Sequence, residues 1–515
     1  MLLLNRFKSL VIFSCLSLFY STTAIAETTE LAEQLNEALT LFNGWIGAAF
    51  FVNINPFSEA EVPLLIAWLG IGALYLTLRM GFVNLTMMRH AFHIIRGRYK
   101  TQGAEGEVTS FQALTTALSA TVGLGNIAGV AIAITIGGPG ATLWMIFAGF
   151  LGMSSKFTEV TLAQMYREKR ADGHIMGGAM EYLSKGLAEK GFMGLGRILA
   201  AIFAVLTIFA SLGGGNAFQV SQAKGAVMSL TPVFDGMPWL FGSIMAVLVG
   251  LVIIGGIKRI AQIAEGLVPS MVLLYVMACL WIIFSHIDQL PQAFSTIFNE
   301  AFHPTAVAGG IIGAIVQGFK RAAFSSEAGL GSAAIAHSAA MVKYPVRQGI
   351  VALYEPFIDT IIICTMTALV IVITGVYDVT AHPELKTLID NEEGAALTSA
   401  AFGTVVSWFP HILTICVILF AYSTMISWSY YGERCWTYLF GERFSIIYRL
   451  IFINVIILSS MVSAKSIVAF SDMALLAMAF PNFIALYWLS GKVKRALNEY
   501  RAKLKSGELD KEVGR

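Results

Sequence analysis

Long apolar runs separated by short polar segments make up most of the chain. An α-helix needs about 20 apolar residues to cross a bilayer, and these runs reach that length without the strict alternation of a barrel strand. The sequence therefore predicts an all-α polytopic membrane protein. After residue 58 the pattern predicts eleven spans, at 59–81, 112–137, 139–166, 197–229, 240–257, 267–288, 305–339, 351–377, 408–437, 445–464 and 468–490.

The N-terminus has the pattern of a secretory signal peptide. Arg6 and Lys8 precede an apolar run, and the small residues of TTAIA follow it. This order predicts a cleaved signal peptide at 1–26, with an uncleaved first helix as the alternative. The next segment, 27–58, contains no Lys or Arg and is predicted to lie on the external side of the membrane.

Composition and charge place the chain in a membrane and predict its orientation. Hydrophobic residues make up 57% of the chain and charged residues 13%, about half the usual charged fraction of ~25%. Lys and Arg concentrate in the segments that follow odd-numbered spans, whereas the opposite side has only Lys224, Lys386 and Lys465. The positive-inside rule then predicts an inner-membrane protein with its N-terminus outside and its C-terminus in the cytoplasm. The basic tail, 491–515, is predicted to be a solvated cytoplasmic end.

The second predicted span has a weak point at its centre, in SATVGLGNIAG. Gly123 and Gly125 lie two residues apart, so they do not share one helix face as a GxxxG pair would. The polar residue Asn126 follows them directly. The pattern predicts a helix that is interrupted in mid-membrane.

The seventh predicted span repeats this pattern in FSSEAGLGSAA. Gly329 and Gly331 again lie two apart, Ser332 follows, and Glu327 is carried into the span. Five spans separate the two copies, so they cross the membrane in opposite directions, which is typical of inverted-repeat transporters. The predicted organisation is a first span with a cytoplasmic loop, a first repeat and a second repeat, at 59–111, 112–290 and 305–490.

An interrupted helix exposes peptide groups that are tolerated only where they line a cavity or meet a ligand. The N-terminus of the second half-helix offers amides and a positive dipole end to a carboxylate. The end of the first half-helix offers carbonyls that suit Na⁺. The two breaks therefore predict a site for a zwitterion together with a sodium ion.

Polar residues in two other spans are candidates for the same site. Gly214 and Gln219 lie in the fourth span, where an amide can either bind a ligand or bridge helices. Ser423 and Thr424 lie in the ninth span and are predicted to bind the cation, with Trp428 as a pocket wall or inner gate.

Acidic residues inside the spans have several possible roles. Glu327 is a candidate for cation binding, proton transfer or a structural contact. Glu355 and Asp359 are predicted to pair with Arg321 or Arg347. The chain contains no GxSxG, HExxH or phosphate-binding glycine loop, so an enzyme is not predicted.

Several motifs together resemble the alanine or glycine:cation symporter family, also called sodium:alanine symporters, of the amino acid–polyamine–organocation superfamily. They are TALSATVGLGNIAGVAIAI, GGPGATLWM, FSSEAGLGSAAIAHSAA, EPFIDTIIICTMTALVI and ISWSYYGERCW. The resemblance covers about 60–490 and implies the leucine-transporter fold, a 5+5 inverted repeat with two broken helices. Leu124 and Ser326 depart from the Thr and Asn found in many relatives, which leaves the exact substrate open.

The resemblance also implies which residues form the site. The substrate contacts that it implies are Thr121, Gly123, Leu124, Gly125, Asn126, Gly214, Gln219, Phe324, Ser326 and Trp428. The sodium contacts that it implies are Thr121, Val122, Asn126, Ser423 and Thr424.

The sequence thus predicts Na⁺-coupled symport of a small neutral amino acid, alanine or glycine first, by alternating access. The alternatives are another substrate such as glutamine, and coupling to H⁺ in place of Na⁺. A channel or a non-transporting sensor is less favoured, because the polar residues form isolated clusters rather than a continuous stripe.

Overall fold

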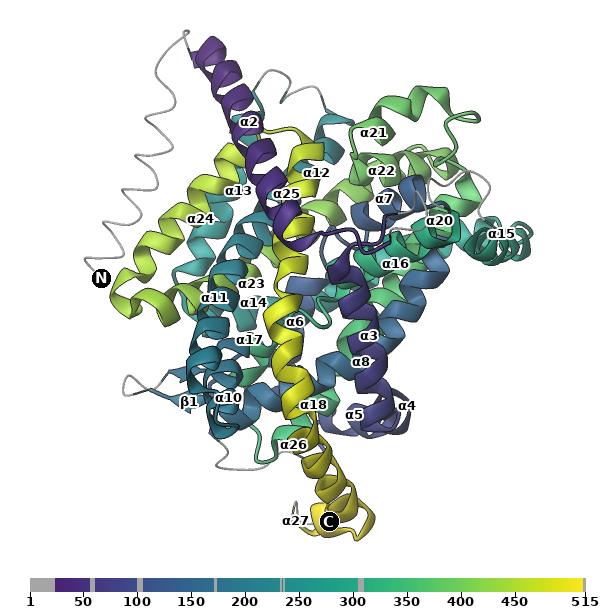
Figure 1. Cartoon of the computed structure of the whole chain (residues 1–515). Coiled ribbons are helices and arrows are strands. Elements are labelled where there is room, and N and C mark those ends of the chain that lie inside the picture. The colour runs from purple at the N-terminus through teal and green to yellow at the C-terminus, as the bar shows by residue number, and fades with distance from the viewer. Residues whose placement is uncertain are drawn as a thin grey trace.

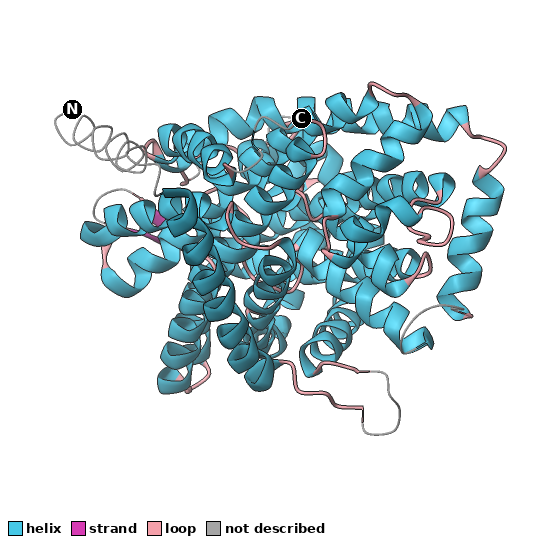
Figure 2. Cartoon of the chain, turned by 90° about the horizontal axis from the view of Figure 1, so that it is seen from above, coloured by secondary structure: helices cyan, strands magenta, loops and turns pink. Residues whose placement is uncertain are grey.

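The computed structural model describes residues 24–55, 61–99, 105–170, 174–231, 234, 237–303 and 310–512. These residues form a bundle of helices (Figures 1 and 2), and the prediction of an all-α protein is confirmed. The strands within the described ranges are one antiparallel pair, β1 (Glu168–Lys169) and β2 (Ile175–Met176).

The predicted signal peptide lies largely outside the described residues, which begin at residue 24. A helix, α2 (Ala24–Phe50), covers the end of the predicted signal and most of the segment predicted as external. Its Asn43 amide donates to the Ser466 carbonyl at 3.3 Å, at the start of α25 (Ala464–Ala477). This segment is therefore a helix that packs against the bundle (Figure 1).

The helices of the predicted first half follow one another as the hydrophobic pattern requires. The described elements are α3 (Leu64–Met80), α4 (Val83–Thr86), α5 (Met88–Ile95), α6 (Ser110–Thr121), α7 (Ala128–Gly137), α8 (Ala141–Tyr166), α9 (Ala179–Glu181), η1 (Tyr182–Gly186), α10 (Leu187–Glu189), α11 (Met193–Leu212), η2 (Gly213–Ala217), α12 (Phe218–Met228), α13 (Pro238–Ile253), α14 (Gly256–Ser285) and α15 (Leu290–Phe302). The interruption predicted in the second span is the gap between α6 and α7.

The second half has the same kind of interruption. Its described elements are α16 (Gly310–Ser326), α17 (Ala333–Ser338), α18 (Pro345–Ala352), α19 (Tyr354–Pro356), η4 (Phe357–Cys364), α20 (Thr365–Thr374), η5 (Pro383–Leu385), α21 (Lys386–Asp390), α22 (Gly394–Val405), α23 (Phe409–Phe440), η6 (Glu442–Phe444), α24 (Ser445–Ser459), α25 (Ala464–Ala477), α26 (Ala479–Lys505) and α27 (Glu508–Glu512). The gap between α16 and α17 is the interruption predicted in the seventh span.

Five helices of the described chain are long and apolar enough to cross a membrane by themselves. They are Met193–Met228, Gly256–Ser285, Pro345–Thr374, Phe409–Phe440 and Ala464–Lys505. Other predicted spans are shorter, as α3 and α13 are, or are divided by a break, as α6 and α7 are. The predicted count of eleven spans is therefore not established, although a helix lies at each predicted position.

The C-terminal tail is not a simple solvated end, and that prediction is wrong. Helix α26 runs without interruption to Lys505, and Leu497 and Tyr500 on it are buried. The Tyr500 hydroxyl lies 2.9 Å from Nε2 of His90 on α5. The tail docks because apolar residues recur on one face of α26 beyond the predicted end of the span.

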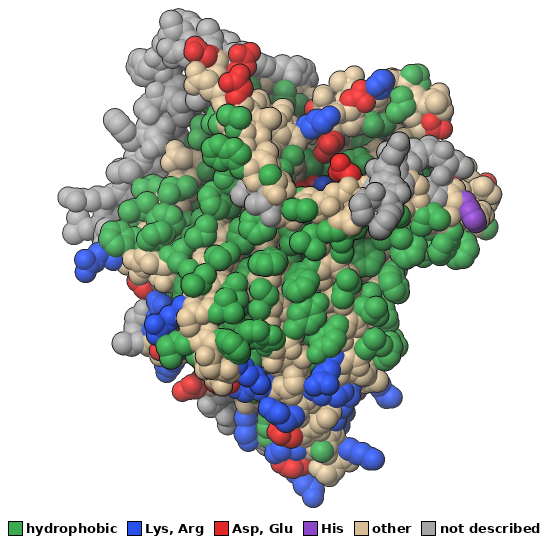
Figure 3. Space-filling model, viewed as in Figure 1, with side chains coloured by type: hydrophobic (Ala, Val, Ile, Leu, Met, Phe, Trp, Pro, Cys, Tyr) green, Lys and Arg blue, Asp and Glu red, His purple; other side chains and the backbone are tan. Residues whose placement is uncertain are grey.

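The molecular surface separates apolar and charged side chains. In Figure 3 hydrophobic side chains form a broad band around the middle, Lys and Arg gather toward the C-terminal end, and acidic side chains gather at the opposite end. Large apolar side chains such as Leu273, Trp281 and Phe284 on α14 are also exposed. A surface of this kind is what a bilayer would cover.

Candidate functional site

The first break is a short irregular segment between α6 and α7. Helix α6 begins with a capping box in which Thr109 and Gln112 bond each other's backbone N–H, and it ends at Thr121. The residues 122–127 are buried but not helical. The N–H of Leu124 is taken by the side-chain oxygen of Gln219 at 3.0 Å, and the N–H of Gly123 by that of Asn126 at 3.3 Å. Neutral amide side chains therefore cap the peptide groups that this break frees.

The second break depends on backbone conformations that glycine provides. Gly329 and Gly331 have φ values of 89° and 82°, in the left-handed region that glycine adopts without strain. Glu327 also lies there, at 54°, which is uncommon for a residue with a side chain. The freed groups bond to neighbouring helices: the Gly331 N–H donates to Glu159 on α8 at 3.1 Å, and the Gly329 carbonyl accepts from Asn482 on α26 at 2.9 Å.

The predicted substrate residues of three elements lie against one another. A Cβ on Gly125 would lie 3.1 Å from the Phe324 ring, and a Cβ on Gly214 would lie 3.6 Å from the same ring. Phe324 also packs against Phe218, with ring centroids 4.8 Å apart. Gln219 connects the two glycine segments, because its Nε2 donates to the Gly214 carbonyl at 2.8 Å. The first break, η2 and the end of α16 therefore meet around the Phe324 ring.

The glycine run GGGN explains how η2 allows this approach. A Cβ on Gly213 would touch Phe470 at 3.0 Å, and Cβ atoms on Gly214 and Gly215 would collide with Leu475 and Trp428. The fourth span adopts a π-helical turn at these residues. Such turns are common at functional sites.

The predicted cation residues of α23 lie beside the end of α6. The Thr424 hydroxyl donates to the Ser119 carbonyl at 3.0 Å, and the Ser119 hydroxyl donates to the Ser423 carbonyl at 2.7 Å. The Thr424 hydroxyl also faces Gly123 so closely that a Cβ there would collide with it. Hydroxyl and carbonyl oxygens therefore converge at the end of α6, together with the buried residues Thr121 and Val122.

Three predicted residues point elsewhere. The Asn126 amide donates to the Asp359 carboxylate and, at 3.2 Å, to its carbonyl. Ser326 donates to the Ala322 carbonyl at 2.9 Å and lines a small cavity beside α3 and α8. The Trp428 indole N–H donates to the Glu327 carboxylate at 2.9 Å, which makes Trp428 a contact of the second break.

The pairing predicted for Glu355 and Asp359 is wrong. Glu355 pairs with Lys156 at 3.3 Å and with His337, whereas Asp359 bonds Asn126 and accepts from Ser325 at 2.6 Å. The arginines have other partners, because Arg321 pairs with Asp472 on α25 and Arg347 donates to the Tyr99 carbonyl at 2.7 Å.

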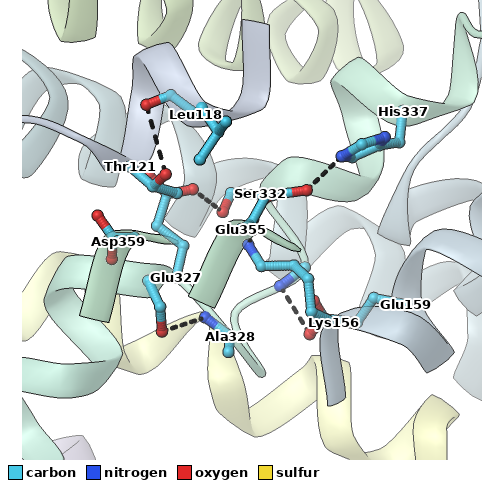
Figure 4. Close-up of polar contacts among 12 residues, drawn as sticks. Leu118, Thr121, Lys156, Glu159, Glu327, Ala328, Ser332, His337, Glu355 and Asp359 are labelled. Carbon is cyan, nitrogen blue, oxygen red and sulfur yellow. Dashed lines mark hydrogen bonds and ion pairs between the residues drawn. The ribbon is translucent and has the colours of Figure 1, made fainter. Parts of the chain in front are cut away.

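A charged cluster beside the second break was not predicted. Lys156 and Glu159 on α8, His337 on α17 and Glu355 on α19 are all buried, as is Glu327 in the break itself (Figure 4). Two ionisable residues, Lys156 and Glu159, interrupt the apolar run of the third span. That pair was a sequence signal for a functional or structural site, since charged residues within spans are costly.

Comparison with known proteins identifies the family. A model of the sodium:alanine symporter family matches residues 46–514. The chain is 41% identical to the sodium/alanine symporter AgcS of Methanococcus maripaludis over 85% of this chain and 94% of that protein. It is 39% identical to an uncharacterized transporter of Haemophilus influenzae, over 87% of this chain and 95% of that protein.

The name of another relative gives a different substrate. The chain is 34% identical to the probable sodium/glutamine symporter GlnT of Bacillus subtilis, over 86% of this chain and 89% of that protein. The family model covers both breaks and the described part of the tail. The chain therefore belongs to the sodium:alanine symporter family.

Proposed function

We propose that this protein is a secondary active transporter that carries a small neutral amino acid, alanine or glycine first, into the cell together with Na⁺. The observation that carries the proposal is the meeting of the first break with Phe324 on one side and Thr424 on the other. The one arrangement offers peptide N–H groups for a carboxylate and oxygen atoms for a cation. The names of the relatives AgcS and GlnT support the coupling to Na⁺.

In this proposal the substrate carboxylate binds the amides of Leu124 and Gly125 in place of the Gln219 oxygen, and the released Gln219 side chain bonds to the substrate. Gly123, Gly214 and Phe324 then surround the rest of the substrate. A Cβ on Gly125 would already lie 3.1 Å from the Phe324 ring, so the space favours a small side chain. This close approach of Phe324, together with the name of the relative AgcS, is the reason for placing alanine and glycine before glutamine.

The cation in this proposal binds at the end of α6. Backbone carbonyls at Thr121 and Val122 and the hydroxyls of Ser423 and Thr424 supply the oxygens, which are the ligands that Na⁺ uses in interrupted helices. Asn126 and Ser326 stabilise the breaks rather than bind ligand, since their side chains bond to Asp359 and Ala322.

The transport cycle that we propose is alternating access by two inverted repeats in the inner membrane. The basic end of the molecule, which includes the C-terminus, would face the cytoplasm (Figure 3). One charge that crosses about 100 mV releases about 2.3 kcal/mol, which supports roughly forty-fold accumulation at about 1.4 kcal/mol per decade.

Uptake by proteoliposomes tests the proposal. We expect radiolabelled alanine to accumulate with an inward Na⁺ gradient, and to equilibrate without accumulation when Na⁺ is equal on both sides. Competition by unlabelled alanine, glycine and glutamine then ranks the substrates. Accumulation that is the same with and without the gradient would rule out Na⁺ coupling, and single-channel currents would indicate a channel.

A further inference from the structure

The buried cluster beside the second break contains more acidic than basic groups. Glu159, Glu327 and Glu355 are within it, and Lys156 is the one lysine or arginine that interacts with all three among the described residues. All four side chains are buried, between 0% and 1% exposed. Burying an unpaired carboxylate is so costly that such a group binds a proton instead. The question is which of the three carboxyl groups holds one.

Glu327 has a hydrogen-bond donor on each oxygen atom, whereas Glu355 has a donor on one oxygen and an ion pair on the other. Glu327 accepts from the Trp428 indole at 2.9 Å and from the Ser332 hydroxyl. Glu355 lies 3.3 Å from the Lys156 ammonium and accepts on its other oxygen from His337 (Figure 4). Two donated hydrogen bonds, or one together with an ion pair, match an ionised carboxylate.

Glu159 has donors on only one oxygen. Its Oε1 accepts from the Asn482 amide at 2.6 Å and from the Gly331 N–H at 3.1 Å. Its Oε2 is buried and has no hydrogen-bond partner among the described residues. The ion pair of Lys156 is formed with Glu355. The carboxyl group of Glu159 therefore has the arrangement of a neutral acid, with an acceptor oxygen on one side and no donor facing the other.

We propose that Glu159 is a proton-binding site, separate from the sodium and substrate sites, with its proton on Oε2. The titratable and charged groups that face it are Lys156 on its own helix, Glu355 on α19 and Tyr182 on η1. The other packed groups are neutral, namely Asn482 on α26 and the Gly331 amide of the break. The ligand is a proton from the solvent.

Loss of this proton would act on the second break. An ionised Glu159 would compete with Glu355 for Lys156 and would bring an uncompensated charge to the contact that holds Gly331 and Asn482. The contact between α8 and the break would then loosen, or admit water. Protonation of Glu159 therefore holds the second break against α8, and rising pH weakens that contact.

The substitution Glu159→Gln tests this assignment, since Gln imitates a protonated Glu. Its carbonyl oxygen accepts from Asn482 and Gly331, and its NH₂ group replaces the protonated Oε2. Purified protein is heated at several values from about pH 5 to about pH 9. We expect the wild-type Tm to fall with rising pH by about 2–4 °C more than that of E159Q. Glu189→Gln, on the exposed carboxylate of α10, should behave as the wild type. Identical pH profiles for the wild type and E159Q would overturn the proposal.

Infrared spectroscopy supplies a test that does not need E159Q to fold well. The wild type should show the stretching band of a protonated carboxyl group at neutral pH, and the band should disappear at alkaline pH. Glu159→Asp keeps the carboxyl group and should shift this band, whereas Glu189→Gln should not. If no band responds to Glu159→Asp, the proton is not on this residue and the proposal is wrong.

A sodium titration separates the proton from a second cation. We expect E159Q to need the same Na⁺ concentration for half-maximal alanine uptake as the wild type. A several-fold higher requirement would make Glu159 a cation ligand and would overturn the proposal. The absence of Na⁺-dependent uptake in the wild type would instead refute the proposed function, and the infrared and thermal results would still decide the role of Glu159.

Discussion

The two breaks have the same glycine spacing but different surroundings. At the first break, neutral amide side chains of Asn126 and Gln219 cap the freed N–H groups, and the Thr424 hydroxyl lies alongside. At the second break, the freed groups bond to Glu159 and Asn482. The first set of contacts is weak enough for a ligand to replace. The second set connects the break to two long helices, α8 and α26.

This difference indicates that the two copies of the repeated motif have different roles. In the proposed function the first break is the binding site, where a carboxylate or cation takes over the contacts that Gln219 and Thr424 now make. The second break has the properties of a support that holds Phe324 against the first. Glu327 fits this role, since it bonds Ser332 at the start of α17 and Trp428 on α23.

The largest effect should come from filling the space at the first break. Gly125→Leu should abolish alanine uptake, because even its Cβ would lie 3.1 Å from the Phe324 ring and the rest of the side chain would occupy the substrate space. The measurement is radiolabel uptake together with substrate-induced thermal stabilisation. Gly266→Leu on α14 is the matched control, because its exposed position has no neighbour within 4 Å. Normal uptake by G125L would remove this glycine from the binding site.

The second break should respond with a loss of stability. Lys156→Met leaves Glu355 buried without its ion pair, and breaking a buried pair typically costs about 3–5 kcal/mol. Thermal unfolding in detergent measures the loss. The double substitution Lys156→Met, Glu355→Gln should recover much of it, because the neutral amide no longer needs a counter-charge. A double variant no more stable than K156M would show that the loss of stability comes from packing rather than from charge.

The sequence revealed the breaks better than their surroundings. Paired glycines next to polar residues at two corresponding places suffice to predict an interrupted helix, because both signals are local in the chain. Lys156 and Glu355 are almost two hundred positions apart in the chain. A hydropathy average treats each of these charges as isolated, so it does not reveal that they pair. The docking of Tyr500 was missed for a related reason, since a helix can continue past its apolar segment and still pack against other helices, as α26 does against α5.

Local sequence patterns likewise predict only part of the site. Gly125, Gly214, Gln219, Phe324 and Thr424 do lie together, and their polar or glycine character within apolar spans was the signal. Asn126 and Ser326 have equally suggestive positions, but the Asn126 amide group donates to Asp359 and the Ser326 hydroxyl donates to the Ala322 carbonyl of its own helix. Which way a polar side chain turns in a break depends on neighbours such as Asp359, and no local pattern contains that information.

A smaller effect should appear at the cation side of the first break. Thr424→Val removes the hydroxyl that faces Gly123 and the Ser119 carbonyl. We expect the Na⁺ concentration for half-maximal uptake to rise about ten-fold, or about 1.4 kcal/mol. Thr437→Val on the same helix is the control, because the buried hydroxyl of Thr437 has no partner among the described residues. An unchanged Na⁺ requirement in T424V would exclude α23 from the cation site.

The finest comparison replaces one capping amide at each break. Gln219→Leu removes a contact that we assign to binding, whereas Asn482→Leu removes one that we assign to support. We expect Q219L to raise the KM for alanine about five-fold. We expect N482L to leave KM unchanged but to lower the free energy of unfolding by about 1 kcal/mol for each hydrogen bond that Asn482 makes, with Gly329, Glu159 and Tyr182.

The two variants are informative because the substitutions are chemically alike and both side chains are buried. A purely structural role for both amides predicts two similar losses of stability with no difference in KM. A binding role for both predicts that KM rises in each. Only different roles for the two breaks predict that N482L changes stability and Q219L changes KM. Uptake kinetics and thermal unfolding of these two proteins can therefore refute the assignment of different roles.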